Sequence, residues 1–292
     1  MSGTYTYELV VDEAGYPQPL PRVKKERLSL DGKPLYLFEN GVVHLHNDRF
    51  EDRTQFEVSP RRSFLAEIES RADNTKLMWF KLWLDRLLSV QVDPKRMRSE
   101  AEREVLYPTH DLSNFAEWYR HLRQDSSAAT DELRSSLQMV IEGFDGLDLK
   151  GPPSGTRLLH VAIRTGSDGT GKTRSYAFDE LSDGQRALVG LYTILHCALT
   201  DRSTLCIDEP DNFVALREIQ PWFSALLDRA QDNGSQVLLV SHHPELLNQL
   251  APRSGVVIER LDAGPTRVRP FAPPSDSTLT PAEIMARGWE DG

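Results

Sequence analysis

The sequence lacks several features that would assign it to a specialised class. It has two cysteines, Cys197 and Cys206, in 292 residues, which are too few for a disulfide framework. No apolar run approaches the roughly 18 residues that a membrane-spanning helix needs, and residues 1–4 carry no charged-then-apolar signal pattern. A cytoplasmic protein is therefore the default expectation.

Positive charge is also scarce. The chain has 34 Lys and Arg against 44 Asp and Glu, for a formal net charge of −10. This balance argues against a protein that coats nucleic acid by bulk attraction. The short basic runs at residues 22–27 and 95–98 are interpreted as solvated surface. The rest of the composition is typical of one large globular domain or two small ones.

Hydrophobic periodicity and Gly- or Pro-rich breaks divide the chain into four parts. Residues 5–11 alternate as a half-buried strand does, whereas Leu77, Phe80, Leu84 and Leu87 or Leu88 recur at helical spacing after a start near Asn74. Gly151–Gly155 is the clearest linker. Residues 1–60 are expected to form a strand-rich segment, and residues 61–150 a helical subdomain. Residues 151–272 are expected to form a lobe with a mostly parallel sheet flanked by helices. Residues 273–292 form a polar tail.

The lobe is expected to alternate strands and helices. Strands at 157–164 and 174–178 are expected to pair as an antiparallel hairpin. Apolar strands at 204–208 and 237–241 are expected to be parallel neighbours, with helices at 182–199 and 216–232 packed on their sheet. Residues 256–261 and 266–271 form a second hairpin pattern, and a last helical turn is expected at 282–286.

A helix start at Ser182 is the most informative local pattern. Ser182 and Gln185 have the spacing of a capping box. A helix amino terminus with free N–H groups, a hydroxyl and a close-approach glycine at Gly184 is also an anion site. These residues alone predict either a well-capped helix or a phosphate contact.

Two carboxylates, Asp208 and Glu209, follow the short apolar run 204–207. The ends of buried parallel strands meet at one edge of a sheet, where ligands bind. Asp208 suits Mg²⁺, which prefers hard oxygen ligands, and Glu209 suits a base that orients or deprotonates water. The alternative is a surface Asp-Glu-Pro turn.

A histidine pair follows the next apolar strand. The segment Ser241-His242-His243 is followed by Pro244-Glu245-Leu246-Leu247. His242 is the stronger site candidate and His243 the weaker one. A histidine after a strand is otherwise often structural or simply exposed.

Taken in order, the stretch 180–186 (Glu-Leu-Ser-Asp-Gly-Gln-Arg), the Asp208-Glu209 strand and the His242 strand resemble the carboxy-terminal lobe of an ABC-type ATPase. Asp183 in the middle of the signature resembles the AAA-annotated clade that includes RecF, SMC and OLD-type proteins. The resemblance is sharp over residues 174–250. It implies ATP and Mg²⁺ as cofactors and a head-to-tail dimer with composite sites.

The resemblance also implies roles for individual residues. The signature residues would contact the γ-phosphate held by the opposite protomer: Ser182, Asp183, Gly184 and Gln185. Asp208 would hold the metal through water, Glu209 would be the base, and His242 would sense the phosphate. Asp211 and Asn212 occupy the D-loop position, but residues 213–216 (Phe-Val-Ala-Leu) depart from the family's usual continuation.

A phosphate-binding loop is missing from its expected upstream place. The only match to Gly-x₄-Gly-Lys-Ser/Thr comprises Gly166, Gly171, Lys172 and Thr173. A working loop of this kind leads from a strand into a helix, whereas residues 174–178 read as a return strand. The match is therefore predicted to be a decoy, and a helix over 174–180 would reverse that interpretation.

Three interpretations follow. The leading one is an ABC-like ATPase that begins after its phosphate-binding loop, through truncation, a late start codon or a split enzyme. The second makes 166–173 a working loop. The third is a non-catalytic module that donates its signature loop to a partner bearing such a loop. DNA repair, chromosome maintenance and phage defence are the candidate processes, with DNA or a nuclease as a further possible partner.

Overall fold

The computed structural model describes residues 3–14, 20–152, 155–165, 171–260, 264–272 and 278–288. The chain divides into two compact units, residues 1–87 and 88–292. The division falls inside the segment that the sequence predicts to be a helical subdomain.

The first unit is an antiparallel meander covered by one helix. Its strands pair in chain order and are β1 (Tyr5–Ala14), β2 (Leu20–Leu30), β3 (Lys33–Glu39), β4 (Val42–His46) and β5 (Asp52–Glu57). A 3₁₀ turn (Leu65–Glu67) and α1 (Thr75–Leu84) follow. Leu77 and Phe80 of α1 are buried with the apolar residues of β2 to β4. Alternation along these strands encodes this one-sided burial.

The second unit begins with strands and helices that lead to the signature helix. They are β6 (Leu87–Val90), β7 (Glu100–Ala101), α2 (Phe115–Asp125), α3 (Ser127–Val140), β8 (Phe144–Lys150), β9 (Arg157–Thr165) and β10 (Lys172–Ala177). The expected hairpin is confirmed, because β9 and β10 pair antiparallel with Lys172 opposite Thr165. β9 also pairs with β8 and β7, both antiparallel.

The remaining elements, from residue 178 onward, include the strands and helices that contain the predicted site residues. After a 3₁₀ turn (Phe178–Glu180) come α4 (Asp183–Thr193), a π-turn (Ile194–Ala198), β11 (Thr204–Asp208), α5 (Leu216–Asp232), β12 (Gln236–Val240) and α6 (Pro244–Ser254). The hairpin of β13 (Val256–Arg260) and β14 (Thr266–Pro270) is confirmed, and α7 (Pro281–Arg287) closes the described chain.

Two expectations about the sheets need correction. β11 and β12 are parallel neighbours, as predicted, but the larger sheets of the described chain are antiparallel rather than mostly parallel. Leu87 and Leu88 do not extend α1. The helix ends at Leu84, and β6 joins the three-stranded sheet with the order β12-β11-β6. The short segment Leu-Leu-Ser-Val at residues 87–90 fits a strand as well as a helix end, so periodicity misassigned Leu87 and Leu88.

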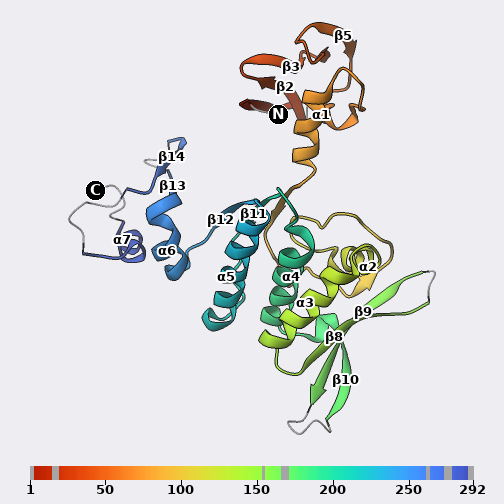
Figure 1. The fold of residues 1–292 in the computed structure, drawn as a ribbon, viewed down its shortest axis with the longest axis vertical. Helices are drawn as coiled ribbons and strands as arrows, with labels where there is room; N and C mark the ends of the chain where they lie inside the picture. Colours follow the sequence, from red (N-terminus) through yellow and green to blue (C-terminus); the bar gives the residue numbers. More distant parts are fainter. Residues whose placement is uncertain are drawn as a thin grey trace. The chain divides into compact units, whose positions relative to one another are not determined.

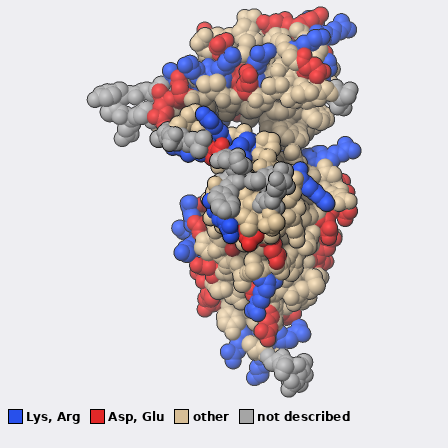
Figure 2. All heavy atoms as spheres, turned by 90° about the vertical axis from the view of Figure 1, so that its left-hand side faces the viewer, with Lys and Arg blue, Asp and Glu red and all other residues tan. Residues whose placement is uncertain are grey.

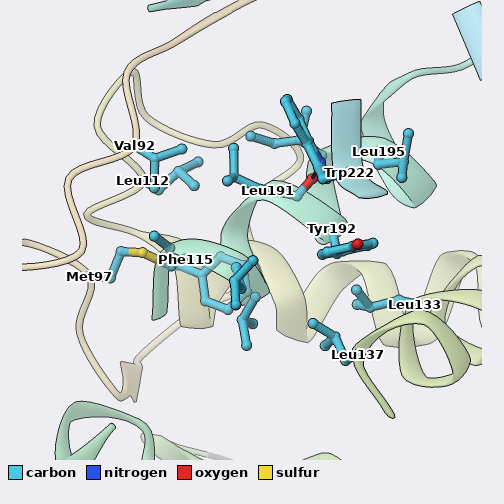
Figure 3. Close-up of a cluster of buried hydrophobic side chains, with 14 of the residues drawn as sticks. Val92, Met97, Leu112, Phe115, Leu133, Leu137, Leu191, Tyr192, Leu195 and Trp222 are labelled. Carbon is cyan, nitrogen blue, oxygen red and sulfur yellow. Dashed lines mark hydrogen bonds between the residues drawn. The ribbon is translucent and has the colours of Figure 1, made fainter. Parts of the chain in front are cut away.

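Helices α3, α4 and α5 lie side by side around a continuous core (Figure 1). Trp222 of α5 is fully buried, and its ring nitrogen donates a hydrogen bond of 2.9 Å to the carbonyl oxygen of Leu191 in α4 (Figure 3). That carbonyl lies just before the π-turn, where the regular ladder of helical hydrogen bonds is interrupted. The indole therefore ties α5 to the end of the signature helix.

The surface is mixed in charge. Lys and Arg are interspersed with Asp and Glu over the face drawn in Figure 2, as expected of solvated side chains. Among the described helices, none combines the length and the apolar character that crossing a membrane requires.

Candidate functional site

The site is built where β11 and β12 end. The two strands run in register, with Asp208 opposite Val240. The backbone N–H of Glu209 then donates a 2.8 Å hydrogen bond to the carbonyl of Val240, which extends the pairing by one residue. The residues after both strands consequently leave the sheet at the same edge, as parallel strands require.

Glu209 and His242 meet at this edge. His242 Nε2 lies 3.1 Å from Glu209 Oε1, as follows from the parallel pairing that was expected of strands 204–208 and 237–241. The Glu209 side chain is 17% exposed and that of His242 is 89% exposed. Burial raises the pKa of Glu209 above its ordinary value, and the neighbouring carboxylates of Asp211 and Asp208 add to the rise. A carboxylate with a raised pKa is a better proton acceptor.

The backbone at Glu209 is unusual. Its φ is 45°, in the left-handed region that side chains with a Cβ disfavour by about 1–2 kcal/mol. Such conformations persist where the surroundings enforce them. Here the bond to Val240 and the contact with His242 hold the residue from both ends.

His243 lies in a different environment from its neighbour. It is 4% exposed and packs edge-on against Phe223, with ring centroids 5.5 Å apart. Its backbone N–H donates to Ser241 Oγ at 2.9 Å. This burial agrees with His243 being the weaker of the two candidates.

Asp208 is half-buried, and its Oδ2 accepts a 2.9 Å hydrogen bond from Gln91 Nε2. Gln91 directly follows β6, so three neighbouring strands deliver polar side chains to one edge. Nowhere in the described part of the chain do three or more His, Cys, Asp or Glu side chains gather as a metal cluster. A role of Asp208 in holding Mg²⁺ stays a prediction from its hard oxygen ligands.

A short turn over residues 209–214 continues from the acid pair. The N–H of Asn212 donates to the Glu209 carbonyl at 3.3 Å, and that of Val214 donates to the Asp211 carbonyl at 3.2 Å. Ser241 Oγ donates a 2.7 Å bond to Asp211 Oδ1. The predicted D-loop residues are thus tied to the end of β12.

The signature loop forms the predicted capping box. Ser182 Oγ accepts from the N–H of Gln185 at 3.2 Å, and the Gln185 side chain accepts from the N–H of Ser182 at 3.1 Å. Ser182 is exposed. Across the described residues, no hydrogen bond joins Ser182 to Glu209. The phosphate contact itself stays a prediction.

Two further contacts shape this loop. The carboxylate of Asp183 pairs with the guanidinium of Arg186, whose side chain is 13% exposed. This pairing offsets part of the negative charge that Asp183 places at the start of α4. A Cβ built on Gly184 would lie 2.9 Å from the carbonyl oxygen of Phe213, so the loop packs tightly on the turn that follows Glu209.

The Gly-Lys-Thr match is built differently from a phosphate-binding loop. Lys172 and Thr173 open strand β10, and only a 3₁₀ turn separates that strand from the signature loop. Gly171 precedes the strand, and Gly166 lies outside the described residues. A helix over 174–180 would have supported a working loop, and the strand there argues against one.

A family model described as "AAA domain, putative AbiEii toxin, Type IV TA system" matches residues 4–248. The chain belongs to this family. Membership in an AAA-domain family supports an ATPase-type protein.

Comparisons with individual proteins are less informative. The chain is similar to a crystal structure of the Smc head domain with a coiled coil and joint from Pyrococcus yayanosii, at 15% identity and a TM-score of 0.39. The match covers 58% of this chain and 31% of that one. No curated protein sequence matches the AAA-domain chain.

One polar residue at this sheet edge was missed in the sequence analysis. Gln91 is the only side chain hydrogen-bonded to Asp208 within the described ranges, yet it was not among the predicted residues. Its signal was a glutamine directly after the strand-like segment 87–90 (Leu-Leu-Ser-Val) and shortly before Pro94. That signal was hidden because the run was assigned to a helix.

Proposed function

We propose that this chain is the acid–histidine and signature part of an ABC-like ATPase that hydrolyses ATP with Mg²⁺ in a head-to-tail dimer. The observation that supports it most is the Glu209–His242 pair, 3.1 Å apart at the shared end of β11 and β12. Membership in the AAA-domain family supports the same reaction class.

The proposed chemistry is in-line attack of water on the γ-phosphorus. Glu209 accepts a proton as the new oxygen–phosphorus bond forms and the bond to the leaving ADP oxygen breaks, which gives ADP and phosphate. His242 lies exposed beside Glu209, where it would contact the γ-phosphate, and Gln91 hydrogen-bonds and orients Asp208. Bound Mg²⁺ would supply neutralisation of phosphate charge next to Asp208.

The phosphates need more than these residues provide. A triphosphate requires several converging N–H groups and a lysine, and the Asp208-Glu209 edge has the opposite charge. β12 is the end strand of its sheet in the described structure. We place the phosphate-binding loop after a further parallel strand beside β12, because a loop there would reach the same edge as Glu209. Lys172 has no part in this arrangement.

Hydrolysis by the assembled protein tests the proposal. The tagged chain is recovered from its native cells with the polypeptides it holds, and Mg²⁺-dependent ATP hydrolysis is measured. Loss of a general base typically costs ~10²–10⁴-fold, so Glu209→Gln is expected to lose activity on that scale. Glu102→Gln, at an exposed position, is the matched control and should retain the wild-type rate. Equal rates for Glu209→Gln and wild type would contradict the proposal.

The alternative function is a non-catalytic module that donates its signature loop to a loop-bearing partner. The exposed Ser182 favours it, because its capping hydrogen bonds are made within the signature loop and do not involve Glu209 or His242. In the same assay this module would tolerate Glu209→Gln but lose activity with a disrupted signature loop. The family description adds a toxin–antitoxin setting to DNA repair, chromosome maintenance and phage defence. All of these can use an ATP-driven dimer.

A further inference from the structure

Gly184 carries a constraint that the signature role does not explain. Its φ lies outside the left-handed region, so an alanine could adopt the backbone, and alanine is the better helix former at this position. The obstacle is steric. An added Cβ would lie 2.9 Å from the Phe213 carbonyl oxygen, and a backbone atom cannot swing aside as the tip of a side chain can. This close packing is within one chain.

Phe213 belongs to the turn that begins at the catalytic base. The turn has two internal hydrogen bonds, Asn212 to Glu209 and Val214 to Asp211. Asp211 is anchored to the end of β12 by the 2.7 Å bond from Ser241. Because this turn is short and hydrogen-bonded at both ends, a displacement of the Phe213 backbone must be accommodated by changes in the backbone dihedral angles of its few residues.

Glu209 is the residue least able to absorb that displacement without effect. Its φ of 45° is already unfavourable, and its N–H is fixed to Val240. Any adjustment in the turn therefore moves the carboxylate relative to His242, which follows a different strand.

We infer that Gly184 is also a positioning residue for the base of its own chain, acting on Glu209 through the Phe213 carbonyl and the 209–214 turn. The inference rests on the proposed function. In a head-to-tail dimer the signature loop serves the opposite protomer's nucleotide, so this contact connects the two nucleotide sites inside each chain. A phosphate that presses on Gly184 at one site then affects the position of the base at the other.

Mixed dimers test this directly. Two differently tagged chains are co-expressed in native cells, one carrying Glu209→Gln, and dimers are recovered through both tags for ATP hydrolysis. When the second chain carries Ser182→Ala, one composite site keeps an intact base and an intact signature loop, so activity is partly regained over either variant alone. When the second chain carries Gly184→Ala, its base is displaced and no activity is regained.

The outcomes separate the two ideas. Recovery with both second chains overturns the positioning role and leaves the composite site standing. No recovery with Ser182→Ala overturns the composite site, and this inference with it. If Gly184→Ala fails to fold, Ser241→Ala replaces it, because it unties Asp211 from β12. A mixed dimer with the Ser241→Ala chain is also expected to regain no ATP hydrolysis, and recovery would overturn the inference.

A spectroscopic comparison tests the same contact. The backbone amide resonance of Glu209 should shift in folded Gly184→Ala but not in Gly190→Ala, whose new Cβ would meet side chains instead.

Discussion

Replacing Trp222 by phenylalanine tests how the signature helix is joined to α5. The indole is 0% exposed and donates 2.9 Å to the Leu191 carbonyl. Leaving a buried acceptor without its partner costs about 1–3 kcal/mol. The lower half of that range applies here, because the N–H of Ile194 also reaches the Leu191 carbonyl. The smaller ring leaves a cavity that costs about a further 1 kcal/mol.

The expected loss for Trp222→Phe is therefore about 2–3 kcal/mol in the free energy of unfolding of residues 88–292. Urea titration followed by hydrogen exchange of α4 and α5 amides measures it, since exchange reports that unit separately. Trp118→Phe is the matched control: Trp118 is 2% exposed, and its indole makes no hydrogen bond within the described part of the chain, so only the cavity cost of about 1 kcal/mol remains. Equal losses for the two variants would refute the role of the indole hydrogen bond.

Two further variants probe the site's electrostatics and capping. Because burial raises the pKa of Glu209, folding disfavours its charged form, and stability is lost as pH rises from the unfolded pKa through the folded one. Glu209→Gln should therefore melt higher than wild type near pH 7, with the advantage gone below the ordinary glutamate pKa of 4.5; a pH-independent difference would contradict this. Ser182→Ala removes the acceptor for the Gln185 N–H and should cost about 0.5–2 kcal/mol by thermal unfolding, and an unchanged midpoint would show that the cap contributes nothing.

Local patterns predicted the elements that depend on local physics. The capping box at Ser182, the β9–β10 hairpin and the parallel pairing of β11 with β12 follow from cap chemistry, alternation and apolar strand length. The proximity of Glu209 and His242 followed from parallel pairing, because residues after such strands share an edge.

Features that depend on tertiary contacts were not predictable in the same way. Leu87 and Leu88 fit both a helix face and a strand, and only pairing with β11 decides between them. The bond from Gln91 to Asp208 spans 117 residues, and the Gly184–Phe213 contact needs the packed turn. The mostly parallel sheet was expected by family resemblance, whereas most described pairings are antiparallel.

The central claim is that this chain supplies the acid–histidine edge of a composite ATP site whose phosphate-binding loop is not residues 166–173. Calorimetric titration of the purified wild-type chain and of Lys172→Ala with ATP and Mg²⁺ tests it most directly. The helix start at Ser182 offers typically ~0.3–1 kcal/mol to an anion, which is too little for tight binding. Weak binding, unchanged by Lys172→Ala, is the expected result. Binding near micromolar Kd (about −8 kcal/mol) by the wild type, lost in Lys172→Ala, would contradict the claim.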